Sequence, residues 1–132
     1  DRLFQDLNNY NQKLNFTVEV NPTKFLDTDF HLNNGQMKTK VHRKDTKLPV
    51  SWNSKIPKQY KRNMLLGDLH RAKKISSNFV EEKKTIKTKY IKAEFPLRFI
   101  NSIVNSFEEK EKNEEIQQDE EDELIIPSFL FR

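Results

Sequence analysis

Two carboxylates in the first quarter of the chain have the spacing of a divalent-metal site. Asp27 and Asp29 lie two residues apart in a segment predicted to be a strand, so both side chains would project from one face. Polymerases hold two metal ions with paired carboxylates. The alternative is a solvent-facing polar stripe, and it is favoured because no third carboxylate lies nearby in the sequence.

No other residues have the arrangement of a catalytic centre. The histidines His31, His42 and His70 are not at metal-ligand spacing, and no serine has a partner base. The only glycines, Gly35 and Gly67, are too far apart to form a phosphate-binding loop. The chain has no cysteine, which excludes disulfides and thiol catalysis. The sequence therefore predicts no independent enzymatic site and no cofactor.

The strongest chemical signal is a cationic stretch. Residues 36–75 contain 12 Lys and Arg against two acids, whereas residues 101–123 contain ten acids against two lysines. Lys and Arg neutralise phosphates and release counterions, which gives sequence-independent affinity that falls with salt. The acidic stretch would repel a polyanion or compete with it. The cations predicted to contact nucleic acid are Lys40, Arg43, Lys44, Lys58, Lys61, Arg62, Arg71 and Lys74.

Two aromatic residues, Trp52 and Tyr60, lie among these cations and are candidates for stacking on a base or a sugar. Trp52 fits a core position equally well. A solvated basic face with no ligand is the alternative for the whole group, and nucleic-acid contact is the favoured interpretation.

The elements that would position these residues begin with a helix over residues 2–12. Residues 16–20 alternate apolar and polar side chains, which predicts a half-buried strand. Residues 25–32 and 36–43 flank Asn34 and Gly35, a pair that favours the positive φ angles of tight hairpin turns. An antiparallel sheet of about three strands is expected.

A connector over residues 44–53 precedes three expected helices. Pro57 opens the first, Asn78 with Glu81 forms a capping-box pattern for the second, and Pro96 opens the third. The apolar stripe of the first helix is predicted to run through Ile56, Tyr60, Met64, Ala72 and Ile75, widened by Leu65 and Leu69. Residues 54–107 are thus expected to form a compact bundle of helix-turn-helix type.

The C-terminal part is acidic and then apolar. Residues 108–123 are interpreted as a solvated helix extension or a disordered linker, and residues 124–131 as an apolar end. No apolar run approaches the roughly 20 residues of a membrane span, which favours a protein without a membrane partner. The absence of cysteine fits an intracellular compartment. The prediction is an α+β fold: a small antiparallel sheet, a three-helix bundle and an acidic, largely disordered tail over 108–132.

Several short segments have a distinctive order and spacing. They are residues 14–20, 25–27, 34–35, 39–44, 54–57, 61–62, 71 with 75–77, 95–100 and 126–127. Together they resemble the part of Penelope-like retroelement reverse transcriptases that follows the catalytic strand. The resemblance covers about residues 7–107. His42 and Asp45 depart from the tyrosine and proline usual in that family.

The resemblance implies that residues 1–43 correspond to the end of the polymerase palm and residues 54–107 to the thumb, which grips the template–primer duplex. Phe25, Leu26 and Asp27 would lie in the hairpin that positions the primer. The family's paired catalytic aspartates and their Mg²⁺ would belong to an upstream palm, which is the expected partner. The expected function is therefore sequence-independent binding of an RNA–DNA or DNA duplex by a fragment of an RNA-directed DNA polymerase, not catalytic alone.

Two other interpretations remain open. The chain is either a stand-alone helix-turn-helix DNA-binding protein or an inert or protein-interaction remnant of a retroelement. A sequence-specific reader would discriminate among duplexes by several kcal/mol. A protein-interaction module would bind nucleic acid weakly or not at all.

Overall fold

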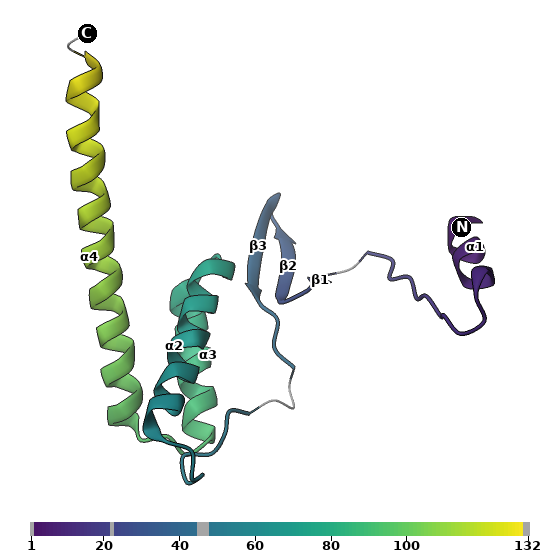
Figure 1. The fold of residues 1–132 in the computed structure, drawn as a ribbon, viewed down its shortest axis with the longest axis horizontal. Helices are drawn as coiled ribbons and strands as arrows, with labels where there is room; N and C mark the ends of the chain where they lie inside the picture. Colours follow the sequence, from purple (N-terminus) through teal and green to yellow (C-terminus); the bar gives the residue numbers. More distant parts are fainter. Residues whose placement is uncertain (1, 22, 45–47, 131–132) are drawn as a thin grey trace.

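A computed structural model describes residues 2–21, 23–44 and 48–130, with side chains described as far as Gln118. The helices are α1 (Arg2–Tyr10), α2 (Lys58–Ile75), α3 (Phe79–Lys92) and α4 (Leu97–Leu130). The strands β1 (Lys24–Phe25), β2 (Thr28–Asn33) and β3 (Gln36–Val41) form one antiparallel sheet in that order (Figure 1). The predicted α+β fold class is confirmed.

The β2–β3 hairpin turns at Asn34 and Gly35, as predicted. Their φ angles are 49° and 77°, and two successive positive values are what a two-residue turn of the favoured hairpin type requires. The pairing runs from Asn33 opposite Gln36 to Thr28 opposite Val41. Local turn chemistry therefore fixes the register of the hairpin.

The predicted strand over residues 16–20 is wrong, because this segment lies outside the sheet. The Asn8 side chain from α1 takes the place of a neighbouring strand. Its Oδ1 accepts the Phe16 N–H at 2.7 Å, and its Nδ2 donates to the Phe16 carbonyl at 3.2 Å. Phe16, Val18 and Val20 are all exposed. The third strand of the sheet is instead β1.

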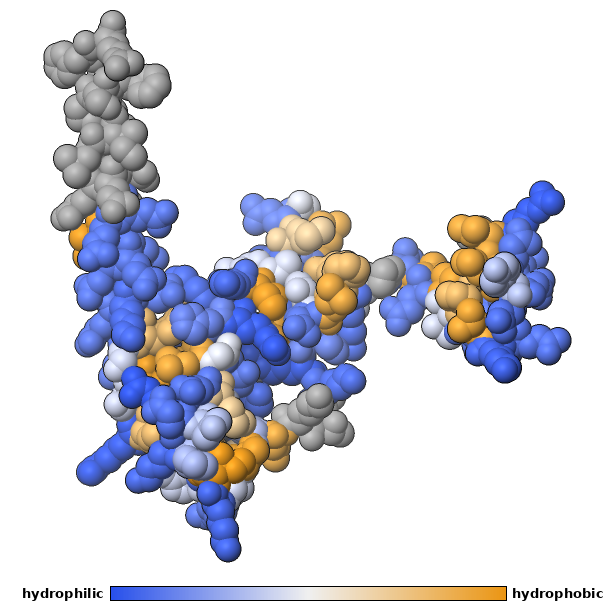
Figure 2. Space-filling view, in the orientation of Figure 1, coloured by the Kyte–Doolittle hydropathy of each residue, from blue (hydrophilic) through white to orange (hydrophobic). Residues whose placement is uncertain are grey.

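The N-terminal part of the chain keeps its apolar side chains at the surface. No residue of α1 is buried, and α1 stands apart from the sheet and the other helices (Figure 1). Figure 2 shows apolar side chains exposed on α1 and on the sheet, among them Leu3, Leu7, Phe25 and Leu32. The hydrophobic core therefore belongs to the remaining helices.

Thr39 of β3 attaches the hairpin to the connection between α2 and α3. Its N–H donates to Ser77 Oγ at 2.9 Å, and its hydroxyl donates to the Ile75 carbonyl at 2.6 Å. The Ser77 N–H in turn donates to the Thr39 carbonyl at 2.9 Å. Two residues further on, Val41 is buried in the core of the helices. Hairpin and helices thus pack as one unit.

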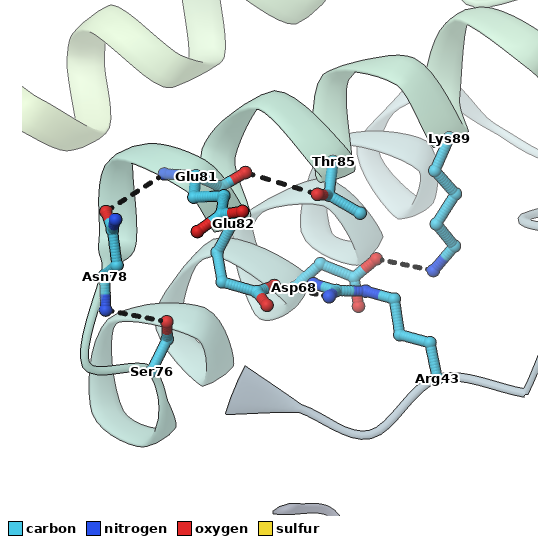
Figure 3. A network of polar contacts seen from close by, with 8 residues as sticks. All are labelled: Arg43, Asp68, Ser76, Asn78, Glu81, Glu82, Thr85 and Lys89. Carbon is cyan, nitrogen blue, oxygen red and sulfur yellow. Dashed lines mark hydrogen bonds and ion pairs between the residues drawn. The ribbon is translucent and has the colours of Figure 1, made fainter. Parts of the chain in front are cut away.

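The predicted helix starts are confirmed. Asn78 caps α3 by accepting the Glu81 N–H through its Oδ1 at 3.2 Å (Figure 3). Pro57 is the N-cap of α2. The Pro96 carbonyl accepts the N–H groups of the first turn of α4. These caps begin α3 and α4 after connections of only a few residues, so the three helices fold back on one another (Figure 1).

The core face of α2 is rotated from the predicted stripe. Leu65, Leu69 and Ala72 are fully buried, whereas Tyr60 is 63% exposed and Ile56 is 38% exposed. The buried residues recur at steps of three and four, as one face of a helix requires. The other buried residues of the core are Ile86, Tyr90, Ala93, Phe95, Ile100, Ile103, Val104 and Phe107, with Val41.

The acidic segment continues α4 as an exposed helix over residues 108–118, so the helix extension is the form adopted and the predicted disorder is wrong for this part. Only Glu108 and Glu111 of this part are partly buried. The apolar end over residues 124–131 lies outside the part whose side chains are described. Within the described chain, no helix has the length and apolar character needed to cross a bilayer.

Candidate nucleic-acid interface

Six of the eight cations predicted to contact nucleic acid are exposed. They come from β3, from the loop that follows it and from α2: Lys40, Lys44, Lys58, Arg62, Arg71 and Lys74. Lys and Arg heads that remain in water are available to phosphates at low desolvation cost. The basic stretch of the sequence therefore forms a surface and not a set of internal ion pairs.

The side of α2 opposite the core, here called the open face of α2, consists of Tyr60, Asn63, Gly67, Arg71 and Lys74. These residues follow one another at steps of three and four and all are exposed. Arg71 Nη2 lies 3.9 Å from Asp27 Oδ2 in the turn between β1 and β2, so the open face adjoins the hairpin. Both side chains are more than half exposed, so this pair is weak.

Lys61 does not belong to this surface, although the sequence predicts that it contacts nucleic acid. The side chain is only 4% exposed. Its Nζ donates to the carbonyls of Trp52 at 2.6 Å and Ser54 at 2.9 Å, and it lies 5.0 Å from the centre of the Trp52 ring. A phosphate cannot reach this ammonium without breaking the contacts that hold the connector to α2.

Arg43 is also engaged within the protein. Its guanidinium donates to Glu82, which is buried at the start of α3 (Figure 3). A buried carboxylate requires such a partner, because an unpaired buried charge is costly. Arg43 therefore anchors the end of β3 to α3, and its side chain is only 25% exposed.

The two aromatic candidates for stacking have different environments. The Trp52 ring packs against those of Phe95 and Phe99, with ring centres 5.3 and 4.9 Å away, and the main-chain N–H of Trp52 donates to the Ala93 carbonyl. Trp52 therefore packs against the core, which is the second role expected for it from the sequence. Tyr60 stands exposed on the open face of α2 and is available for stacking on a base.

Asp27 and Asp29 do not form a carboxylate pair on one strand face. Asp27 lies in the turn between β1 and β2, while Asp29 lies within β2. Asp29 Oδ1 is bonded to His42 Nδ1 at 2.8 Å, and Asp27 faces Arg71. Among the residues described, no group of three metal-ligating side chains comes together.

The acidic part of α4 lies against a different side of α2 from the open face. Glu111 and Glu115 approach Lys73 Nζ at 3.4 and 3.8 Å, and Glu108 pairs with Lys83 of α3. Arg62 lines a small groove with Glu111 and Glu114. The negative potential of these glutamates therefore weakens the attraction of Arg62 and Lys73 for a polyanion. The open face of α2 is the side on which a polyanion binds most favourably.

The basic set inferred from the sequence stopped at residue 74 and missed the lysines of α3. Lys84 and Lys92 are exposed on the side of α3 away from the core. Lys87 and Lys89 are instead bonded to Asn101 and Asp68. The signal was present, because α3 carries five lysines against two acids over 14 residues.

A further polar cluster joins α2 to α3 below the open face. Asp68 Oδ2 accepts from Lys89 Nζ at 3.0 Å and from the Tyr90 hydroxyl at 3.1 Å. Burial, together with the charge of Asp68 and this hydrogen bond, raises the pKa of the Tyr90 phenol well above its ordinary value. Tyr90 therefore stays protonated and remains a donor to Asp68.

Comparisons of the chain with protein-family models, with curated proteins and with solved structures found no match.

Proposed function

We propose that this chain binds the backbone of a nucleic-acid duplex without reading its sequence, as the thumb part of a retroelement RNA-directed DNA polymerase. The observation that carries the binding proposal is the open face of α2, where Arg71 and Lys74 are exposed and Arg71 reaches the sheet at Asp27. Lys40 of the same sheet and Lys44 in the loop after β3 are also exposed. The polymerase assignment rests on the sequence resemblance over residues 7–107. Exposed cations on a packed scaffold favour phosphate contact over base readout.

In this proposal the chain binds the duplex, and an upstream palm carries out phosphoryl transfer. Phosphoryl transfer depends on carboxylates that hold metal ions in line with the reacting phosphate. Asp27 and Asp29 are engaged with Arg71 and His42 instead. The hairpin and the helices would hold the duplex while the palm aspartates and their Mg²⁺ act on the primer end.

The proposal predicts that the full chain does not discriminate among duplexes of equal length. We expect RNA–DNA hybrids of three unrelated sequences to compete with a labelled hybrid within about twofold of one another, because phosphate contacts carry no sequence information. Fluorescence anisotropy at fixed salt measures this. A preference of several kcal/mol for one sequence would instead identify a sequence-specific reader.

The stand-alone helix-turn-helix alternative has one observation in its favour. Only residues 76–78 separate α2 from α3, which is the short turn of such motifs. The side of α3 away from the core exposes Lys84, Thr88 and Lys92. In that alternative, replacing Thr88 and Lys92 by alanine would change which duplex binds best, whereas a duplex-gripping thumb would lose only affinity.

A further inference from the structure

A groove of about 390 Å³ opens where the connector passes over α2 and α3. This volume lies within the range of small-ligand sites. Both apolar and polar side chains line it, among them Arg71 of the open face of α2. The lining residues are Leu48, Pro49, Asn63, Met64, Gly67, Asp68, Arg71, Lys89 and Tyr90.

Because Gly67 has no side chain, the backbone of α2 is accessible from this groove. A glycine within a helix costs roughly 0.5–1 kcal/mol relative to alanine. A Cβ added at Gly67 would meet no atom of the described chain within 4 Å, so packing gives no reason for a glycine here. The open space beside the helix is therefore suited to a ligand that approaches the backbone closely.

Asp68 supplies a hydrogen-bond acceptor at the same groove. Both donors that reach this carboxylate within the described chain, Lys89 Nζ and the Tyr90 hydroxyl, go to Oδ2. Oδ1 has no hydrogen-bond donor among the described residues, and the side chain is 25% exposed. An ionised carboxylate only accepts, so a ligand that meets Oδ1 must present an N–H or O–H group.

We infer that this groove binds an unstacked nucleobase that carries an exocyclic amino group, supplied by a single strand that adjoins the bound duplex. The inference rests on the proposed function and adds a base preference to it. The amino group donates to Asp68 Oδ1, the ring packs over Gly67 and against Met64, and Arg71 pairs with the phosphate of the same nucleotide. Uracil and thymine carry a carbonyl oxygen at position 4 in place of this amino group, so that edge cannot donate to Oδ1. Their ring donor N3–H lies between two carbonyl oxygens, which a carboxylate repels.

The groove fits a base better than other ligands of similar size. Its apolar part matches the face of a base, which stacks on side chains once it is unstacked from its neighbours. Lys89 pairs with the Asp68 carboxylate, and Arg71, which also lines the groove, remains available for the phosphate of the nucleotide. Asp68 therefore meets the base of the nucleotide, and Arg71 meets its phosphate.

The test uses the full chain and RNA–DNA hybrids that end in a short RNA overhang of cytidines or of uridines, with the blunt hybrid as reference. The two bases differ at positions 3 and 4 of the ring: cytosine has an acceptor at N3 and a donor at N4, whereas uracil has a donor at N3 and an acceptor at O4. We expect the cytidine overhang to bind about tenfold more tightly than the uridine overhang, in line with the discrimination of a good base contact. The uridine overhang should bind about as well as the blunt hybrid.

Two variants separate this contact from a structural role. In Asp68→Asn the amide oxygen remains with Lys89 and Tyr90, since both are donors, and the amide NH₂ takes the place of Oδ1. The preference should then reverse toward uridine, whose O4 accepts. Gly67→Leu fills the groove and should abolish the preference, whereas Gly67→Ala adds only a Cβ and should retain most of it. Thermal unfolding of each variant confirms that it is folded.

Equal binding of the cytidine and uridine overhangs by a protein that binds the blunt hybrid would overturn this inference and leave the proposed function standing. An unchanged cytidine preference in folded Asp68→Asn would overturn it as well. Failure to bind any hybrid would overturn the proposed function, and the inference with it.

Discussion

Lys61→Ala is expected to lower the free energy of unfolding by about 2–3 kcal/mol, whereas Arg62→Ala changes it by less than about 0.5 kcal/mol. Lys61 is 4% exposed and donates to the main-chain carbonyls of Trp52 and Ser54, just before α2. Its removal leaves those carbonyls without their donor and a void under Trp52. Arg62 is exposed and has no such contacts within the described chain.

Urea unfolding followed by the fluorescence of Trp52, the single tryptophan, measures both variants directly. Lys61→Met is the informative control, because it keeps most of the aliphatic stem and removes only the ammonium. Its loss of stability should lie between those of the two alanine variants. If Lys61→Ala and Arg62→Ala unfold at the same urea concentration, Lys61 is an ordinary surface cation and its placement in the core is wrong.

The double variant Arg71→Ala/Lys74→Ala should lose roughly a hundredfold in affinity for an RNA–DNA hybrid at 50 mM salt. Each phosphate contact contributes roughly 0.9 to the slope of log affinity against log salt, which amounts to about tenfold between 1 M and 50 mM. The slope should therefore become shallower by about 1.8. Both residues lie exposed on the open face of α2, so their replacement leaves the core untouched.

The matched control for this variant is Lys110→Ala/Lys112→Ala, which removes the same charge from the acidic part of α4. Both lysines are exposed and stand among glutamates that a polyanion avoids. The affinity for the hybrid and the slope of log affinity against log salt should both stay close to those of the unmodified chain. An equal loss in the control would mean that binding follows net charge alone and has no defined face.

Local chemistry made the turns and helix starts predictable. Asn34 with Gly35, Asn78 with Glu81, and the prolines before α2 and α4 each act through neighbouring backbone groups, so their effect is visible in the sequence. The strand over residues 16–20 could not be judged in this way. Its pairing partner is a side chain of α1, Asn8, and alternation alone does not reveal which group will satisfy the backbone.

The candidate site was only partly predictable, because a run of cations does not show which members are buried. Lys61 lies one residue from Arg62, yet its position on the core face of α2 and the carbonyls of the connector bury it. Likewise, Asp68 and Tyr90 are 22 residues apart and meet only once α2 and α3 have packed. Such contacts depend on tertiary structure, so they follow from the fold and not from spacing.

The most direct test of duplex-backbone binding is the salt dependence of hybrid binding by the unmodified full chain. We expect a log–log slope of roughly −4 to −5, which corresponds to about five phosphate contacts made by the exposed cations. Binding that is absent, or whose affinity does not change with salt, would contradict it and would favour a protein-interaction or inert remnant.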